Sequence, residues 1–445
     1  MRVVIIGAGF GGLCLANGLQ RHPDIEIEVF ERHTDPSHEL AGYGLHVGAD
    51  GKRAVRHCLD GASFQRFLAA TTPAGSKWAF RDTNLNTIAL RDDAKISARP
   101  AEDVETRAVH RFEFRDILLK GLRLRGDGGK VQVHWGKSFV RHEEEFSDSN
   151  PNANGNGNAN ANREERGAGS GSIRAFFEDG TSALGDVLVG ADGSKSLVRQ
   201  QRLPGLKREE LGVAIICGRY QLTPDRVKHL PELMTDGSLN NIVPWGKGWL
   251  FLASFPSTEV EDVKEDYTLW AYVVPKGEVD METMKRLSAE EMRDLALEGV
   301  GGWKDEIVRI VKDVDLSTVS PILLRSMPVL KDWTSSRVVL IGDSVHNMTP
   351  MAGVGANIAL RDAHLLSDLL AEAQDGKMAL IEAIAKYEVE MKRYANAAVA
   401  LSRQIAKGAS STSAMQRWAF HGLLRLAQAS PRVMRHTIGA GALQD

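Results

Sequence analysis

Residues 7–12, Gly7-Ala8-Gly9-Phe10-Gly11-Gly12, join the apolar tetrapeptide Val-Val-Ile-Ile to a longer apolar segment. The tetrapeptide is typical of a buried parallel strand, and the following segment has the composition of a helix. In such a strand, turn and helix, Gly7 permits the tight turn, Gly9 lets the backbone approach a pyrophosphate, and Gly12 allows close packing of helix on strand. The helix N-terminus would offer free N–H groups to phosphate charge. The stretch therefore predicts a dinucleotide-binding site.

A second strand is expected at residues 25–30, and it ends at Glu31, nineteen residues after Gly12. An acid at this distance is suited to accept hydrogen bonds from ribose hydroxyls. Arg32 is a candidate contact for the adenosine half, although a solvated arginine explains it equally well. A purely structural glycine turn is the alternative, but strand, spacing and acid together favour dinucleotide binding.

The composition is that of an ordinary soluble globular protein. The 445 residues are 43% hydrophobic and 25% charged, and the length allows two or three domains. A formal net charge of -3 gives no electrostatic reason to expect nucleic acid as a partner. The three cysteines, Cys14, Cys58 and Cys217, are far apart and indicate neither a disulfide framework nor a metal site. No apolar run reaches the roughly 18 residues of a membrane span and no secretory signal is evident, so a cytoplasmic location is expected.

The middle of the chain has the pattern of an antiparallel sheet. Apolar and polar residues alternate between about residues 212 and 276. Aromatic side chains in this region could line an apolar substrate pocket, but a sheet face packed on helices explains them without a ligand. They include Trp245, Trp249, Phe251 and Trp270.

Residues 150–162 are almost entirely Asn, Gly and Ala. Such a segment cannot bury apolar surface, so a disordered loop is expected. Strand-like runs at residues 131–135 and 173–177 lie on either side of it. The insert is therefore expected to extend a hairpin connection between these two strands.

Two later segments complete a cofactor site. Asp192-Gly193 follows a short apolar strand, and an acid beside a flexible turn could reach a ribityl chain or pyrophosphate-bound water. Gly342-Asp343 ends another buried strand, and the residues after it lead into an amphipathic helix at 358–370. The N-terminus of that helix, with about half an elementary charge, would favour the anion of a reduced flavin ring. The contacts expected from this late segment are Asp343, Pro350, Gly353, Gly355, Ala356 and Asn357.

The chain resembles the class A flavoprotein monooxygenases, the aromatic hydroxylases with the para-hydroxybenzoate hydroxylase fold, over roughly residues 1–395. Three fingerprints occur in order: GAGFGG from Gly7, GADGSKSLVR ending at Arg199, and GDSVHNMTPMAGVGANIALRDA from Gly342. The late motif departs from the family form, G-D-A-A-H-x-x-x-P-x-x-G-x-G-x-N, only in small or local substitutions.

The resemblance implies cofactor roles for residues outside these fingerprints. Arg111 and Arg115 match the family's R-x-x-L-R-x-x-L helix and would lie near the flavin or its phosphates; a solvated helix face is the alternative for Arg115. Gly44 belongs to a glycine-containing stretch that would pass the isoalloxazine ring. His46, in the same stretch, could hydrogen-bond flavin or substrate, or could simply be packed.

The resemblance also implies a substrate site. In dearomatising members of the family, an arginine of the Asp-Gly segment and a sheet tyrosine bind a phenolate substrate. Arg199 and Tyr220 are therefore candidates, with a core position the alternative for Tyr220.

The implied fold is α/β, with a discontinuous Rossmann-like FAD-binding domain, an inserted and mainly antiparallel β-sheet substrate domain, and a C-terminal helical segment. The amphipathic residues 415–426 are expected to dock on the two domains rather than touch a membrane. The expected boundaries are 1–75, 102–205 and 325–395 for the FAD-binding domain, with a disordered loop at 147–170; 76–101 and 206–324 for the substrate domain; and 396–445 for the C-terminal helices.

The resemblance implies an FAD-dependent monooxygenase. In that family NADPH or NADH reduces the flavin, O2 adds to give a C4a-hydroperoxyflavin, and its distal oxygen hydroxylates an aromatic or other electron-rich small molecule, secondary metabolism being one setting. A related flavin dehydrogenase or epoxidase and a non-catalytic FAD-binding scaffold are the alternatives. A monomer or homodimer is expected.

Overall fold

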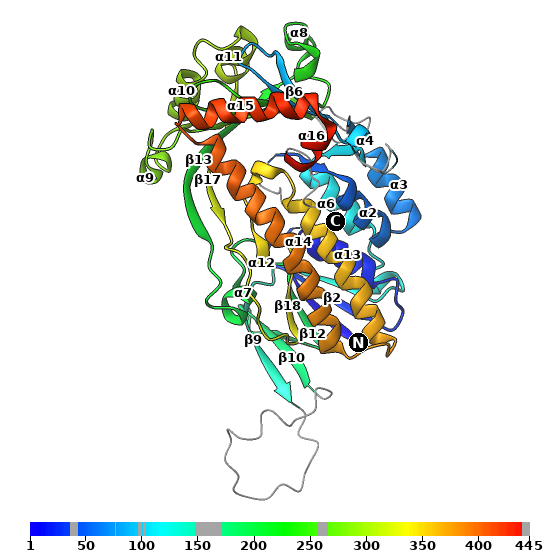
Figure 1. Cartoon of the computed structure of the whole chain (residues 1–445). Helices are drawn as coiled ribbons and strands as arrows, with labels where there is room; N and C mark the ends of the chain where they lie inside the picture. Colours follow the sequence, from blue (N-terminus) through cyan, green and yellow to red (C-terminus); the bar gives the residue numbers. More distant parts are fainter. Residues whose placement is uncertain are drawn as a thin grey trace, which may run out of the picture.

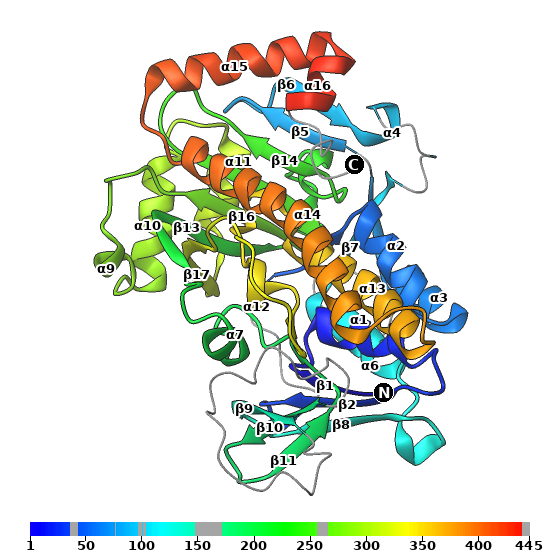
Figure 2. The same ribbon diagram turned by 60° about the horizontal axis from the view of Figure 1, so that its bottom comes forward.

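The computed structural model describes residues 1–35, 43–75, 77–96, 100, 104–146, 171–255 and 266–437. The Asn- and Gly-rich segment, residues 150–162, lies outside this part of the chain. A half built on a parallel sheet and a half built on a broad mixed sheet are connected by the long helix α14 (Leu380–Ala409), drawn in orange in Figures 1 and 2.

The parallel sheet confirms the Rossmann-like fold. The Val-Val-Ile-Ile run lies in strand β1, which has parallel partners on both sides and is buried over its last four residues. A strand with neighbours on both edges and helices above it has no polar face, which explains the continuous apolar run. The strands, in spatial order, are β18 (Val338–Leu340), β12 (Val187–Gly190), β1 (Arg2–Ile6), β2 (Glu26–Glu31) and β8 (Val131–Trp135).

Helices from distant parts of the chain pack together beside this sheet. Helix α1 (Phe10–Leu19) contacts both α13 (Gly355–Gln374) and α6 (Arg111–Lys120), and α13 also contacts α2 (Ala49–Cys58). The contact between α1 and α13 is close, because a Cβ added at Gly18 would lie 2.8 Å from the Ser367 side chain. Further helices of this half include α3 (Gly61–Ala69), α7 (Leu197–Arg202) and the short α12 (Asp343–His346).

One expected strand pairing is wrong. Residues 131–135 form β8 of the parallel sheet, whereas the antiparallel partner of β10 (Gly171–Phe177) is β9 (Phe139–Phe146). The hairpin before the insert is therefore formed by β9 and not by residues 131–135. A short apolar run is typical of a buried parallel strand as well as of a hairpin strand, so the sequence does not distinguish them. Strand β11 (Ser182–Gly185) completes this small sheet.

The broad sheet has two packed faces. One face is covered by α10 (Ala289–Gly299) and α11 (Asp305–Lys312), and the other turns toward the parallel-sheet half. Its strands pair antiparallel except β14 with β5. In spatial order they are β17 (Asp315–Ser326), β13 (Glu209–Gln221), β16 (Tyr267–Val273), β15 (Trp249–Phe255), β14 (Leu239–Ile242), β5 (Lys77–Arg81) and β6 (Thr87–Asp92). A small sheet of β3 (Leu45–Val47), β7 (Thr106–Val109) and β4 (Thr72–Gly75) completes the strands around the site.

The C-terminal helix α15 (Ala414–Ala429), red in Figure 1, docks on the broad sheet. A docked helix was expected, but its main packing is on this sheet and not on both domains. Its buried face includes Arg417 and Leu424, and the Arg417 guanidinium donates to the carbonyl oxygen of Gly248. Helix α16 (Pro431–Thr437) follows it. Within the described ranges, every helix is too short or too polar to span a bilayer.

Candidate functional site

The glycine turn is closed at two positions and open at the third. Gly7 has a φ of +110°, and a Cβ there would lie 2.4 Å from the carbonyl oxygen of Ala191. A Cβ at Gly12 would lie 2.1 Å from the carbonyl oxygen of Gly7, so helix α1 can approach β1 only without a side chain. A Cβ at Gly9 would meet nothing within 4 Å. The turn is therefore packed on the protein side and accessible at the N-terminus of α1.

Glu31 and Arg115 hold this turn. The Glu31 carboxylate accepts a hydrogen bond from the Ala8 N–H at 2.8 Å, and its other oxygen lies 2.7 Å from Nδ1 of His33. Arg115 is buried, and its Nε donates to the Ala8 carbonyl oxygen at 3.2 Å. The solvated alternative for Arg115 is therefore wrong, whereas Arg32 is exposed beside Glu31.

Asp192 and Arg199 stabilise the adjoining Asp-Gly segment. Asp192 Oδ2 accepts from the Leu197 N–H at 2.8 Å, at the start of α7, while Oδ1 is buried without a partner in the described structure. Burial raises the Asp192 pKa, against the lowering effect of its hydrogen bonds. Arg199 donates from Nη1 to the Ser344 carbonyl oxygen at 2.9 Å. One oxygen of Asp192 and one nitrogen of Arg199 are thus used in hydrogen bonds to the protein backbone.

The late motif forms a second turn facing the first. Asp343 is exposed directly after the positive-φ Gly342, and Gly353, with φ +66°, ends the 3-10 turn Pro350–Ala352 just before α13. Asn357, in the first turn of α13, accepts from the Gly48 N–H at 2.8 Å and donates to the His46 carbonyl oxygen at 3.0 Å. It thereby ties α13 to strand β3. The two remaining predicted contacts of this segment, Gly355 and Ala356, form the start of α13.

Arg111 connects these segments. It begins α6, and its guanidinium lies over the Phe10 ring, 5.5 Å from the centroid. Burial lowers its pKa, and the nearby Asp343 carboxylate opposes that effect. Its Nε is buried without a partner among the described residues. Arg111 therefore sits between the glycine turn and the Gly-Asp turn.

An aromatic and cationic cluster covers the Gly44 backbone, and sequence reasoning missed it. The Tyr267 hydroxyl accepts from the Gly44 N–H at 2.8 Å, and the Arg219 guanidinium lies 4.7 Å from the Tyr267 ring centroid. Tyr43 flanks the same guanidinium at 5.4 Å. A Cβ at Gly44 would lie 2.4 Å from the Phe255 ring, so a side chain there is excluded. The alternation of side chains in β13 and β16 could have placed Arg219 and Tyr267 on one face of the sheet. It could not have shown which face of the sheet turns toward the parallel-sheet half.

His46 is the neighbour of this cluster. Burial lowers its pKa to about 4, so its imidazole is neutral near pH 7, and its Nε2 has no partner in the described structure. Its ring lies 4.9 Å from that of Phe255. A neutral imidazole with an unpaired nitrogen can donate to or accept from a ligand.

The structure does not bring Tyr220 to this cluster. Tyr220 is 2% exposed and packs with Trp270 on the sheet face covered by α10 and α11. Strand alternation explains this, because Tyr220 and Arg219 are adjacent in β13 and must point to opposite faces. Tyr220 therefore belongs to the core, as its alternative predicted. Trp245, by contrast, is 51% exposed and stacks on His421.

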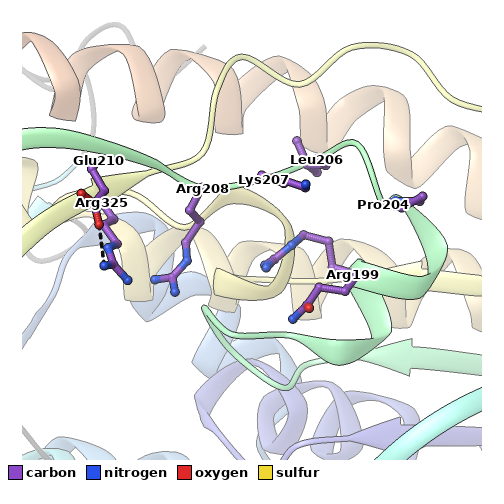
Figure 3. A pocket seen from close by; sticks show the side chains of 8 residues that line it. Arg199, Pro204, Leu206, Lys207, Arg208, Glu210 and Arg325 are labelled. Carbon is purple, nitrogen blue, oxygen red and sulfur yellow. Dashed lines mark hydrogen bonds and ion pairs between the residues drawn. The ribbon is translucent and has the colours of Figure 1, made fainter.

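A basic pocket of about 500 Å³ adjoins the Gly-Asp turn (Figure 3). Arg199, Arg208 and Arg325 extend toward one another there, and Arg325 pairs with Glu210 at 2.6 Å. Burial lowers the pKa of Arg208, the Arg325 charge lowers it further, and the Asp343 carboxylate opposes both. The other lining residues are Gln200, Pro204, Leu206 and Lys207. Four cations and one carboxylate make this pocket suited to an anion.

The residues fit a flavin dinucleotide. Unsatisfied polar atoms are rare in protein interiors and call for a partner. Here Asp192 Oδ1, Arg111 Nε and His46 Nε2 are buried without one in the described part of the chain. The backbone of Asp192 lies against Gly7, and Arg111 lies over Phe10, so two of the three adjoin the glycine turn. These groups match the polar atoms of FAD. Asp192 can accept from hydroxyls, Arg111 can donate to a phosphate or ring oxygen, and the neutral imidazole of His46 can donate or accept.

Comparisons with known proteins agree with this geometry. Residues 296–402 match the family model described as FAD binding domain, and residues 5–58 match the NAD(P)-binding Rossmann-like domain. The solved structure of a candidate FAD-containing monooxygenase from Photorhabdus luminescens subsp. laumondii TTO1 is 36% identical, with a TM-score of 0.77. The match covers 92% of this chain and 98% of that one.

Two fungal relatives are more distant in sequence. The FAD-dependent monooxygenase thnD of Trichoderma harzianum is 28% identical over 93% of this chain and 95% of its own length. The dual O-methyltransferase/FAD-dependent monooxygenase CTB3 of Cercospora beticola is 28% identical over 88% of this chain, but the match covers 44% of CTB3. The chain thus spans less than half the length of that dual relative.

Proposed function

The chain belongs to the FAD-containing monooxygenases, and from this premise we propose that it uses NADPH or NADH and O2 to hydroxylate an aromatic or other electron-rich small molecule. FAD is its cofactor. The observation that carries the proposal is that three segments far apart in sequence, at Gly7, Asp192 and Asp343, follow the carboxyl ends of three adjacent parallel strands, β1, β12 and β18. We propose the boundaries given above as the division of the chain into an FAD-binding domain, a substrate domain and C-terminal helices. The expected cytoplasmic location and monomer or homodimer state stay predictions.

We assign the predicted residues to parts of the cofactor. The turn at Gly7, Gly9 and Gly12 would hold the pyrophosphate, Glu31 and Arg32 the adenosine ribose side, and Arg115 supports the turn from beneath. Asp192 and Asp343 would accept hydrogen bonds from the ribityl hydroxyls or from water bound to the pyrophosphate. The ring would lie against the Gly44 backbone, His46, Arg111 and the start of α13, from Pro350 through Gly353, Gly355 and Ala356 to Asn357.

Bound FAD would supply a flavin ring that a nicotinamide can reduce and that can then transfer one oxygen atom from O2 to the substrate. The chain contributes position and exclusion of water. Phe255, Tyr267 and Tyr43 form an aromatic wall, and Arg219 beside them would orient an anionic or phenolic substrate. This gives Arg219 and Tyr267 the substrate role that the sequence suggested for Arg199 and Tyr220.

The freshly purified, folded protein is expected to carry FAD and to consume NADPH or NADH faster when an aromatic substrate is present. The absorption spectrum and the FAD content after denaturation measure the first point. The loss of NADPH or NADH absorbance with and without substrate measures the second. Mass spectrometry with ¹⁸O2 then tests hydroxylation, because one labelled atom should enter the product. Folded protein without FAD would contradict the cofactor assignment, and bound FAD with oxidation but no labelled product would favour a flavin dehydrogenase.

The basic pocket is our proposed site for the phosphates of the nicotinamide dinucleotide. Arg208→Gln is expected to raise KM for the reductant by about tenfold or more and to leave the bound FAD in place, since a charge-assisted hydrogen bond contributes roughly 1.5–3 kcal/mol. Steady-state oxidation of the reductant at varied concentration measures the effect. Lys276→Gln, which removes an exposed cation elsewhere, is the matched control and should leave KM unchanged. Equal constants for wild type, Arg208→Gln and Arg325→Gln would rule the pocket out.

A further inference from the structure

Two histidines and one aspartate converge between α2 and α13. His57 lies near the end of α2, whereas His364 and Asp368 stand one turn apart on α13. His57 Nε2 is 2.7 Å from Asp368 Oδ1, and His364 Nε2 is 3.3 Å from Asp368 Oδ2. One donor atom from each residue lies within 4.8 Å of the other two. The three side chains therefore point at one small volume.

This arrangement suits a metal ion better than a pair of charged histidines. The two imidazole rings stack with centroids 3.9 Å apart, so protonating both would place two like charges face to face. Neutral imidazoles with one carboxylate are the donor set that Zn²⁺ prefers, and residues at i and i+4 on a helix present ligands to the same side. Zn–N distances of about 2.0–2.1 Å imply ligand atoms roughly 3.3 Å apart, which small side-chain rotations would reach.

The cluster is also accessible. The side chains of His57, His364 and Asp368 are 37%, 33% and 45% exposed, so an ion could enter from solvent and complete its coordination with water.

We propose that His57, His364 and Asp368 bind one borderline divalent transition-metal ion, best matched by Zn²⁺. Such an ion would join the last turn of α2 to the middle of α13. Asn357 already joins the starts of the same two helices, beside the proposed ring site. Its role would be to fasten the helix pair that frames the cofactor. The sequence predicted no metal site, because 306 residues separate His57 from His364 and only the packing of α2 on α13 brings them together.

The test uses the full-length protein with its bound FAD, treated with chelator and dialysed. Isothermal titration with Zn²⁺ should show one ion per chain, Co²⁺ should give the visible absorption of a low-symmetry site, and Zn²⁺ should raise the thermal midpoint. His364→Ala should weaken Zn²⁺ binding by about tenfold or more and remove the thermal response, and His364→Cys, which supplies another zinc ligand, should restore binding. His229→Ala, at an exposed histidine elsewhere, is the matched control and should bind as wild type does.

Identical Zn²⁺ titrations and thermal shifts for wild type and His57→Ala/His364→Ala would overturn the proposal and leave a hydrogen-bonded His–Asp–His cluster. Because flavin absorbance is recorded in the same samples, loss of the metal response with FAD retained is distinct from failure of the cofactor assignment. Folding of each variant is checked by its flavin content and circular dichroism.

Discussion

Gly9→Asp is expected to give a folded protein that has lost FAD. Gly9 is the N-cap of α1, its φ of -84° suits any residue, and a Cβ there meets nothing within 4 Å. Aspartate is a favoured N-cap, so helix α1 should be as stable as before or more so. The same carboxylate would occupy the space proposed for the pyrophosphate and repel it. We expect FAD affinity to fall by at least about 100-fold, roughly 3 kcal/mol.

Flavin fluorescence titration of the apoprotein and a thermal melt measure the two effects separately. Gly11→Ala is the matched control on the same turn, because its Cβ would lie 3.4 Å from Ile341, at the edge of ordinary contact. It should keep FAD binding within a few-fold. Co-purification of FAD with Gly9→Asp at wild-type occupancy would show that the open side of Gly9 is not the phosphate site.

Asp362→Ala is expected to lower the free energy of unfolding by about 3–5 kcal/mol. Asp362 is fully buried, and its Oδ2 accepts from the Gly342 N–H at 2.7 Å and lies 2.6 Å from His346 Nε2. Its Oδ1 accepts from the Tyr394 hydroxyl at 2.6 Å. Removing the carboxylate leaves these buried donors unsatisfied and releases the Gly-Asp turn. Denaturant unfolding measures the loss, and Asp375→Ala, an exposed change on the C-cap of the same helix, should stay within about 0.5 kcal/mol.

The pH dependence of this difference follows from His346. Burial alone would lower its pKa, but the Asp362 carboxylate outweighs burial and raises it above the ordinary value. A raised folded-state pKa adds stability that is complete below the unfolded value of about 6.5 and disappears as pH rises through the raised value. The gap between wild type and Asp362→Ala should therefore be widest in mild acid and narrow toward alkaline pH. A gap that widens with pH would contradict the assigned pair.

Local patterns were the reliable part of the sequence. The strand, turn and helix around Gly7 and Gly12 were predictable because they are consecutive in the chain and Gly12 packs against the carbonyl oxygen of Gly7 itself. The close contact of Gly7 with Ala191, by contrast, comes from a distant segment. Residues 131–135 form a strand, as predicted, but they pair with β2 and not with residues 173–177. An apolar run alone does not indicate which strand it pairs with.

Arg219 and Tyr220, which are adjacent in β13, and Arg115 illustrate which side-chain positions at the site the sequence could not predict. Alternation in β13 requires Arg219 and Tyr220 to face opposite ways, but only the packing of α10 and α11 on one face decides that Tyr220 is core and Arg219 faces Tyr267. Arg115, which sequence could not distinguish from a solvated residue, is buried because α6 packs on α1.

The sequence by itself determined the Rossmann-like fold and the three segments proposed to bind the cofactor, since each is a short motif with its own local geometry. Only the tertiary structure decided that Arg219 and Tyr267 lie together over the Gly44 backbone, that Arg199, Arg208 and Arg325 share one pocket, and that His57 meets His364 and Asp368. The physical reason is sequence separation: these groups are brought together by sheet order and helix packing, which depend on burial over the whole chain and leave no local pattern.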